Sequence, residues 1–335
     1  MEVEIFVLTY NRKDSLRHTI SSLLNQTFTE FKILVLDNAS NYDVNESLAT
    51  FNDSRIELIV NSENIGPVEN YVKAINLASS DYVMIFHDDD TLPSNFLFNQ
   101  ISLFKKHNNI GFVVSGINLI TSISELDLQS ESKLEYILFE KLGEMIKCFY
   151  EYPTFGSSSI MFKTNVAKNG IIGYEMYGNV VDRMMLLNCS KEHTFAYMVN
   201  PKYNALQHET QDSSNRSWSF EYDINLANLY LTSIKYFNHE EYIFKVIKSI
   251  SEFYVYSKNK FSILKTIKKI SFQNNYYIIY FILLIPYLFL KSKILLFIKK
   301  YFLNYFIALN HNNYNRKLSK LKSNIIVQQN SNSIL

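Results

Sequence analysis

The sequence predicts an α/β domain built on a mostly parallel, Rossmann-like sheet, followed by a helical extension. In residues 1–100, short runs rich in Val, Ile, Leu and Phe alternate with segments of helical periodicity. Polar residues follow each apolar run, and from residue 219 onward the pattern is helical, basic and aromatic. We therefore expect two parts, an α/β domain over residues 1–218 and a helical region over residues 219–335.

The first four apolar runs and the segments between them have the order βαβαβαβ. The expected strands are Ile5–Thr9, Phe31–Asp37, Ile56–Asn61 and Tyr82–His87, and the expected helices are Ser15–Asn25, Asn45–Phe51 and Pro67–Ser79. Strands that alternate with helices form parallel sheets covered on both faces, and such sheets bind ligands beyond the carboxyl ends of their strands. The polar segments that follow the four strands should therefore converge on one site.

Residues 109–199 continue the α/β pattern more weakly. We expect a strand at Gly111–Ser115, a helix near Leu134–Tyr150 and another helix near Val181–Leu187. No readable motif marks residues 116–175, where we expect the determinants of acceptor specificity.

Composition excludes several classes of protein. Hydrophobic residues make up 47% of the 335 residues and charged residues 19%, which is typical of a globular chain and not of a disordered one. Cys148 and Cys189 are the two cysteines, so a disulfide framework and a CxxC zinc site are both excluded. The acidic N-terminal residues Glu2 and Glu4 stand where a secretory signal is basic, so we expect the domain in the cytosol.

The C-terminal region is strongly basic, although the whole chain has a net charge of only +1. No acidic residue follows Glu252, whereas Lys258 to Lys322 contain thirteen basic residues among many apolar ones. The uncharged stretch Ile270–Leu290 is just long enough to span a bilayer, but polar residues and Pro286 interrupt it. We favour helices lying in the interface of an anionic membrane, over a membrane span or a packed bundle, and expect no nucleic-acid partner.

The sharpest motif is an apolar strand that ends in three carboxylates, Asp88, Asp89 and Asp90. Adjacent acids repel one another, and oxygen ligands with open positions suit Mg²⁺ or Mn²⁺. The alternative is a solvated acidic loop that caps the helix beginning near Asn95. A phosphatase of the haloacid dehalogenase type is disfavoured because Leu92 stands where Thr or Val belongs and because the cluster follows the fourth strand.

Four segments in this order resemble the family 2 glycosyltransferases of GT-A fold, of the bacterial cell-surface polysaccharide type. They are Val7-Leu8-Thr9-Tyr10-Asn11-Arg12, Val35-Leu36-Asp37-Asn38-Ala39-Ser40, Asn64-Ile65-Gly66 with Asn70, and His87-Asp88-Asp89-Asp90. The resemblance covers residues 2–115 clearly and residues 150–215 more faintly. His87 replaces the first acid of the family's DxD motif, and Asp89 matches the second.

The resemblance implies a role for each matching residue. Those expected to bind the nucleotide are Thr9, Tyr10, Asn11, Arg12, Asp37, Asn64 and Asp88, and those expected to hold the metal are Asp89, Asp90 and His208. The alternative for Thr9 and Asp37 is that they cap the helices that follow their strands.

The catalytic base implied by the resemblance is Asp182, with Glu175 in reserve. General-base catalysis requires a carboxylate within hydrogen-bond reach of the attacking hydroxyl. The alternative for Asp182 is a residue at the start of a helix that pairs with Arg183 or a neighbour.

The implied reaction is an inverting transfer from a nucleotide diphosphate sugar, by default a UDP-sugar, to the hydroxyl of a glycan or lipid-linked acceptor in surface polysaccharide synthesis. The enzyme would be peripheral on the inner face of the cell membrane. A non-catalytic, membrane-attached scaffold that binds nucleotide or glycan is the main alternative. A dinucleotide-dependent oxidoreductase ranks last, because no GxGxxG motif follows the first strand.

Overall fold

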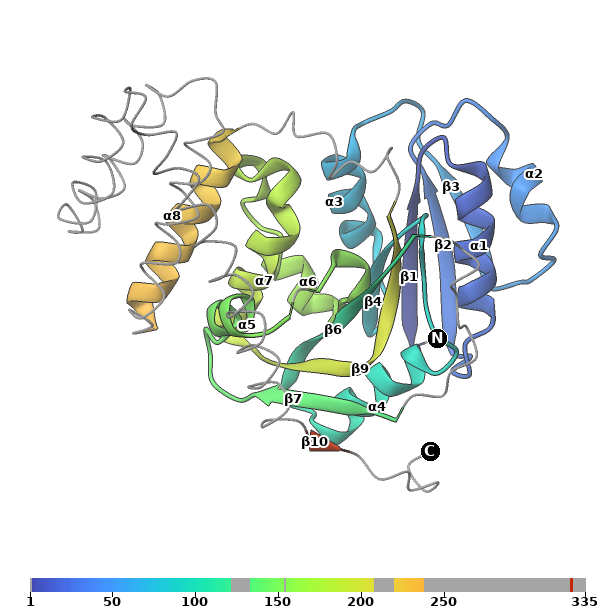
Figure 1. The fold of residues 1–335 in the computed structure, drawn as a ribbon. Coiled ribbons are helices and arrows are strands. Elements are labelled where there is room, and N and C mark those ends of the chain that lie inside the picture. Colours follow the sequence, from blue (N-terminus) through green and yellow to red (C-terminus); the bar gives the residue numbers. More distant parts are fainter. Residues whose placement is uncertain (1, 122–132, 154, 208–219, 238–325, 328–335) are drawn as a thin grey trace, which may run out of the picture. The chain divides into compact units, whose positions relative to one another are not determined.

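The computed structural model describes residues 2–121, 133–153, 155–207, 220–237 and 326–327 (Figure 1). Contacts divide the chain into two compact units. Unit 1 contains residues 1–144, 154–218 and 325–335, and unit 2 contains residues 145–153 and 219–324. The predicted domain boundary between residues 218 and 219 remains a prediction.

The first half of unit 1 is the βαβαβαβ arrangement that the sequence predicts. Its elements are β1 (Val3–Thr9), α1 (Lys13–Leu24), β2 (Phe31–Asp37), α2 (Val44–Ala49), β3 (Ile56–Val60), α3 (Pro67–Leu77) and β4 (Tyr82–His87). The four strands are parallel and lie in the order β3-β2-β1-β4. Helices α1 and α2 lie on one side of these strands and α3 lies on the other (Figure 1).

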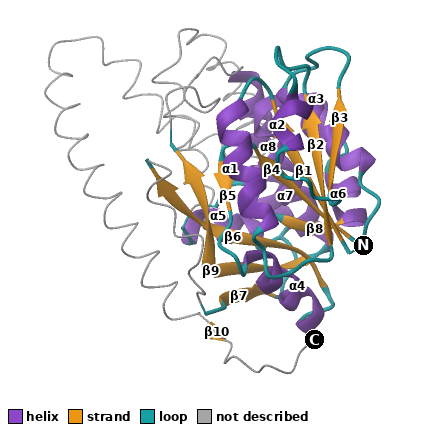
Figure 2. Ribbon diagram, turned by 90° about the vertical axis from the view of Figure 1, so that its right-hand side faces the viewer, coloured by secondary structure: helices purple, strands orange, loops and turns teal. Residues whose placement is uncertain are grey.

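The second half of unit 1 extends the same sheet with strands that are mostly antiparallel to their neighbours. Its elements are β5 (Asp90–Thr91), α4 (Phe96–Lys106), β6 (Ile110–Ile120), β7 (Glu135–Phe139), β8 (Met161–Lys163), α6 (Thr164–Gly170), α7 (Val181–Glu192), β9 (Thr194–Leu206) and β10 (Ile326–Val327), with short 3₁₀ turns η2 (Ser157–Ser159), η3 (Tyr174–Met176) and η4 (Gly178–Val180). The full order is β10-β7-β9-β6-β8-β4-β1-β2-β3, and β5 pairs with β9. Figure 2 shows β7, β9 and β10 at the end of this mixed sheet remote from β3.

The expected helix near Leu134–Tyr150 is wrong over its first part. Residues 135–139 form β7, which pairs with β9 on one edge and β10 on the other, and the helix α5 begins only at Met145. A short apolar run such as this one cannot be assigned to helix or strand by periodicity, and pairing partners distant in sequence decide the outcome.

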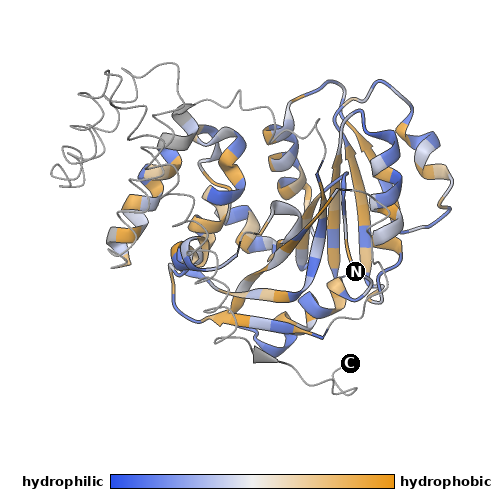
Figure 3. Ribbon diagram, in the orientation of Figure 1, coloured by the Kyte–Doolittle hydropathy of each residue, from blue (hydrophilic) through white to orange (hydrophobic). Residues whose placement is uncertain are grey.

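The core of unit 1 lies on both faces of the parallel strands. All residues of β1 except Leu8 are buried, as are all residues of β2 except Lys32. Figure 3 shows these strands as largely hydrophobic ribbon, with polar residues gathered at their ends. In the second half, Phe195 stacks between Phe112 and Phe139, with ring centroids 4.9 and 4.4 Å apart. Burial on both faces is the reason that these strands read as continuous apolar runs in the sequence.

The described part of unit 2 consists of α5 (Met145–Glu151) and α8 (Phe220–Tyr236). Tyr230 of α8 contacts Phe149 and Tyr150 of α5, at ring-centroid distances of 5.6 and 6.0 Å. No helix in the described ranges has both the length and the hydropathy that a membrane crossing requires. The expected membrane segment Ile270–Leu290 lies outside the described residues.

Candidate active site

The carboxyl ends of the parallel strands bring the predicted site residues together. In the sheet register, Thr9 at the end of β1 pairs with Asp37 at the end of β2, and Leu8 pairs with His87 at the end of β4. The loops that follow these strands therefore start from neighbouring positions on one edge of the sheet. This convergence is the one that strand order predicts for a ligand site.

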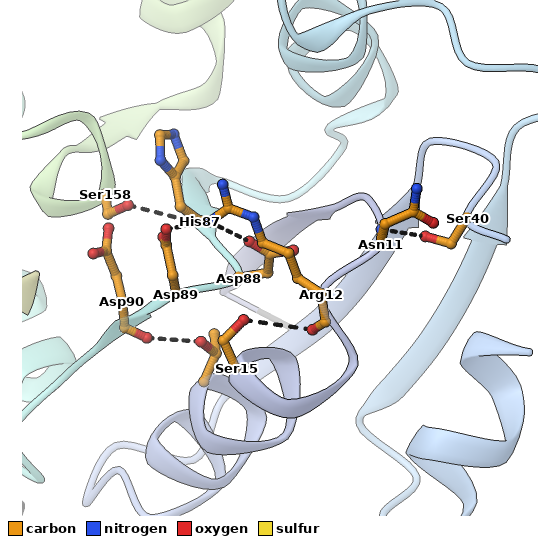
Figure 4. A network of polar contacts seen from close by, with 10 residues as sticks. Asn11, Arg12, Ser15, Ser40, His87, Asp88, Asp89, Asp90 and Ser158 are labelled. Carbon is orange, nitrogen blue, oxygen red and sulfur yellow. Dashed lines mark hydrogen bonds and ion pairs between the residues drawn. The ribbon is translucent and has the colours of Figure 1, made fainter. Parts of the chain in front are cut away.

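The loops after β1 and β2 are tied to each other by hydrogen bonds. The backbone N of Asn11 donates to Ser40 Oγ at 2.9 Å (Figure 4). Ser40 Oγ donates to Asp37 Oδ1 at 2.6 Å. Asn11 Oδ1 in turn accepts from the backbone N of Asn41 at 2.8 Å. Asn11 and Ala39 have φ angles of 57° and 63°, in the left-handed region that few residues other than glycine adopt. Such backbone strain is common where loops are shaped for a ligand.

Thr9 and Asp37 are both buried, and neither caps the helix that follows its strand. The N-cap residue of α1 is Arg12. The N-cap residue of α2 is Asp43, whose carboxylate accepts from two backbone N–H groups of the helix. The helix-capping alternative for Thr9 and Asp37 is therefore not observed. Tyr10 stands next in the chain, and 45% of its surface is exposed.

Buried asparagines hold the loop between β3 and α3. Asn38 Oδ1 accepts from Asn61 Nδ2 at 2.9 Å and from the backbone N of Ile65 at 3.0 Å, while Asn38 Nδ2 donates to Asn64 Oδ1 at 2.9 Å. Asn61 Nδ2 also donates to Asn70 Oδ1 at 2.9 Å. These bonds place Asn64, a predicted nucleotide-binding residue, beside the ends of β2 and β3.

Asp88 and Asp89 form the turn between β4 and β5, and Asp90 is the first residue of β5. Asp88 is 5% exposed and Asp90 is 6% exposed, and the β5–β9 pairing together with a bond from Thr19 Oγ1 to the Asp90 carbonyl anchors the turn. Burial, together with the neighbouring charge of Asp89, raises the pKa of Asp88 to about 7, although a hydrogen bond with Thr9 and the charge of Arg12 oppose the rise. Burial also raises the pKa of Asp90, with the charge of Asp89 as the second cause. Both shifts favour the protonated acids, and a nearby positive charge would favour the ionised ones.

His87, Asp89 and Asp90 form a group that fits a divalent cation. One ligand atom from each lies within 4.8 Å of the others. The backbone N of His87 donates to Ser158 Oγ at 3.1 Å, and His87 Nε2 lies 3.2 Å from Ser157 Oγ, so η2 orients this side chain. Carboxylate and imidazole groups are both common metal ligands, and a ligating histidine usually has a hydrogen-bond partner on its other ring nitrogen.

The sequence analysis did not name His87 among the candidate metal ligands and treated it only as the replacement for an acid. β4 ends at His87, and the turn that follows brings Asp89 and Asp90 close to it, which the sequence pattern does not show. Asp89 and Asp90, the predicted metal ligands, belong to the group. The third predicted ligand, His208, lies outside the described residues.

Asp182 lies in the first turn of α7. Burial raises the pKa of the Tyr203 phenol on β9, and the charges of Asp90, Asp89 and Asp182 raise it further, so all three carboxylates act on this side chain. Gly156 permits this position of Tyr203, since a Cβ at Gly156 would lie 1.7 Å from the phenol oxygen.

The alternative role for Asp182 is a residue at the start of a helix that pairs with a neighbour, and one hydrogen bond is consistent with this role. Asp182 Oδ1 accepts from the backbone N of Arg183 at 2.8 Å. Glu175, the reserve base, is an exposed residue of η3.

Residues 4–169 match the family model described as Glycosyl transferase family 2. The chain is 32% identical over 122 residues to an Escherichia coli protein named UDP-Glc:alpha-D-GlcNAc-diphosphoundecaprenol beta-1,3-glucosyltransferase WfgD, a match that covers 36% of this chain and 48% of that protein. It is 29% identical over 198 residues to the GalNAc(5)-diNAcBac-PP-undecaprenol beta-1,3-glucosyltransferase of Campylobacter jejuni, covering 58% of this chain and 61% of that protein. The chain thus spans less than two thirds of the length of either relative.

Among solved structures, the chain is similar to residues 1–349 of S. aureus TarS in complex with UDP-GlcNAc. The TM-score is 0.55 and the sequence identity is 16%, with 70% of this chain and 66% of that chain covered. The TarS complex with UDP gives a TM-score of 0.51 at 14% identity. At these identities the similarity concerns the fold alone.

Proposed function

Residues 4–169 form a family 2 glycosyltransferase domain with a GT-A-like fold, and from this premise we propose that the protein transfers a sugar from a UDP-sugar to an acceptor hydroxyl with inversion of configuration. One observation carries the proposal. The His87, Asp89 and Asp90 ligand group lies at the carboxyl edge of the parallel sheet, and Asp182 shares the surroundings of Tyr203 with two of its members.

The residues at the ends of β1 and β2 form the nucleotide side of the proposed site. Thr9, Asp37 and Asn64 are positioned there by strand register and by the bonded loops. Tyr10, with 45% of its surface exposed, offers an aromatic ring for contact with a base. We take UDP as the nucleotide because the relative WfgD is named as a transferase that uses UDP-Glc.

The reaction needs a base for the acceptor and positive charge for the leaving group. Asp182 accepts the proton of the acceptor hydroxyl as that oxygen attacks the anomeric carbon opposite the nucleoside diphosphate, so the configuration inverts. Asp89 and Asp90, with His87 or His208, would hold Mg²⁺ or Mn²⁺, which supplies positive charge that stabilises the leaving diphosphate.

A lipid-linked glycan is the acceptor that we propose, and the inner face of the cell membrane is the proposed location. Two relatives are named for acceptors that contain undecaprenol diphosphate. The thirteen basic residues between Lys258 and Lys322 provide attraction to an anionic membrane surface.

A transfer assay with a matched pair of variants tests this proposal. UDP-glucose and other UDP-sugars are incubated with a synthetic undecaprenyl diphosphate sugar and Mn²⁺, and the products are resolved by mass spectrometry. Asp182→Asn should abolish transfer and leave UDP binding within about twofold, whereas Glu175→Gln should keep most of the activity. Full turnover by Asp182→Asn would remove that residue from the base role, and UDP binding without transfer to any acceptor would favour the scaffold alternative.

A further inference from the structure

The guanidinium group of Arg12 contacts the carboxylate cluster. Arg12 Nη1 forms an ion pair with Asp89 Oδ2 and lies 3.8 Å from Asp88 Oδ1 (Figure 4). The two carboxylate side chains are 9% and 7% exposed, and the Arg12 side chain is 22% exposed. Ion pairs this sheltered from solvent are screened less by salt than surface pairs. Removing the Arg12 guanidinium would therefore leave the buried charges of Asp88 and Asp89 without compensation.

Asp89 has two competing uses. It is the residue that pairs with Arg12, and it is also a member of the His87–Asp89–Asp90 ligand group. A divalent cation and the Arg12 guanidinium therefore compete for the Asp89 carboxylate. Each binds this carboxylate more weakly in the presence of the other, because the two positive charges repel each other.

Arg12 begins a helix and follows a loop that the sheet register places beside the nucleotide side of the proposed site. It is the N-cap residue of α1, and it directly follows Asn11, whose loop is bonded to the loop after β2. A guanidinium group matches the oxygens of a diphosphate at least as well as those of a carboxylate. A nucleoside diphosphate bound at this edge offers Arg12 a second anionic partner.

We propose that Arg12 is an internal counter-ion that couples the binding of nucleotide and metal, pairing with Asp89 in the empty site and with the nucleotide diphosphate in the occupied one. This inference rests on the proposed function, because it takes the donor to be a nucleoside diphosphate sugar. Nucleotide binding draws the guanidinium from Asp89 and makes that carboxylate available to the cation. By linkage, the cation then improves nucleotide binding by the same factor.

The inference makes opposite predictions for the two ligands when Arg12 is replaced. In Arg12→Gln, Mn²⁺ alone should bind about threefold or more tightly, because its competitor is absent, whereas UDP alone should bind more weakly. The factor by which UDP improves Mn²⁺ binding, about 5- to 150-fold for typical coupled sites, should fall at least about threefold, because only the direct attraction between the cation and the diphosphate then remains. A residue that merely supported the fold would weaken both ligands together.

The experiment is a binding cycle on the full chain. Mn²⁺ binding is measured by electron paramagnetic resonance of the free ion with and without UDP, and UDP binding is measured by calorimetry with and without Mn²⁺. Arg17→Gln is the matched control, since Arg17 is an exposed residue of the same helix and its loss changes the net charge equally. Arg12→Lys retains a positive charge and serves if Arg12→Gln fails to fold.

The outcomes separate the inference from the proposed function. Tighter Mn²⁺ binding and reduced coupling in Arg12→Gln, with Arg17→Gln unchanged and Arg12→Lys intermediate, would support the counter-ion role. Coupling in Arg12→Gln as strong as in the unmodified protein, or weaker binding of Mn²⁺ in the absence of UDP, would overturn that role, while UDP binding by the unmodified protein would still support the proposed function. Failure of the unmodified protein to bind UDP at all would overturn both.

Discussion

Replacing Asn38 with alanine should loosen the loop between β3 and α3. The Asn38 side chain is 4% exposed and makes three hydrogen bonds, with the side chains of Asn61 and Asn64 and with the backbone N of Ile65. In the variant, Asn61 keeps its hydrogen bond with Asn70, and Asn64 keeps its hydrogen bond with the backbone N of Gly66. The backbone N–H of Ile65, in contrast, loses Asn38 Oδ1 as its acceptor. The damage is therefore concentrated at one backbone amide.

The structure sets the size of the expected effect. Three hydrogen bonds with a net contribution of about 0.5–1.5 kcal/mol each give a loss of about 2–4 kcal/mol in the free energy of unfolding, less any relaxation of the loop toward water. Asn76→Ala is the matched control, because Asn76 is an exposed residue of α3 and its replacement should change stability by no more than about 0.5 kcal/mol.

Urea denaturation and hydrogen exchange measure the two parts of this prediction. The denaturation midpoint of Asn38→Ala should fall relative to Asn76→Ala, and the peptide that contains Ile65 should exchange its amide hydrogens at least about tenfold faster. UDP should also bind more weakly, because Asn64 loses the bond from Asn38 that positions it. Unchanged exchange at Ile65 together with unchanged stability would refute the assignment of the asparagine cluster as the support of this loop.

Three further predictions concern the metal, the pH dependence of stability and the membrane. Mn²⁺ bound to the protein should show nitrogen coupling in pulsed paramagnetic resonance and lose it in His87→Asp; coupling that persists in the variant would assign the nitrogen ligand to His208 instead. Burial and the charge of Lys106 lower the pKa of His107 in the folded protein, so the neutral side chain contributes fully to stability above the unfolded pKa of about 6.5, and this contribution is lost as pH falls through the lower folded pKa. His107→Asn should therefore make the free energy of unfolding, measured by denaturation between pH 7 and pH 5, less dependent on pH. An unaltered pH dependence would show that His107 is not the group responsible. A chain truncated at Ser257 should no longer sediment with anionic vesicles, and continued sedimentation would exclude the basic region as the attachment.

The first half of the fold was predictable because β1, β2 and β4 are largely buried and the connections between its strands are short helices. β2 and β4 begin and end where the sequence analysis placed them, and β1 differs from its prediction only by an earlier start. The second half depends on pairings between segments distant in sequence. β7 was expected as helix, and β9 was not identified, because each is defined by partners on neighbouring strands that a local pattern cannot reveal.

The residues of the candidate site were predictable where motifs follow strand ends. They were less predictable where the three-dimensional fold brings together side chains that are distant in the sequence. The positions of Asp37 and of the three acids followed from strand order and resemblance. His87, Asp89 and Asp90 come together because of the turn that leads into β5. The ion pair between Arg12 and Asp89 joins residues that are 77 positions apart in the sequence. No sequence spacing encodes a contact of that kind, since the sheet register creates it.

The most direct test of the central claim is calorimetric titration of UDP, GDP and dTDP into the purified full chain with and without Mn²⁺, repeated with Asp89→Ala. We predict Mn²⁺-dependent binding of UDP in preference to the other nucleotides, and its loss in Asp89→Ala. Binding of none of the three nucleotides, or UDP binding that is unaffected by both Mn²⁺ and the substitution, would contradict a metal-assisted nucleotide-sugar site at the end of β4.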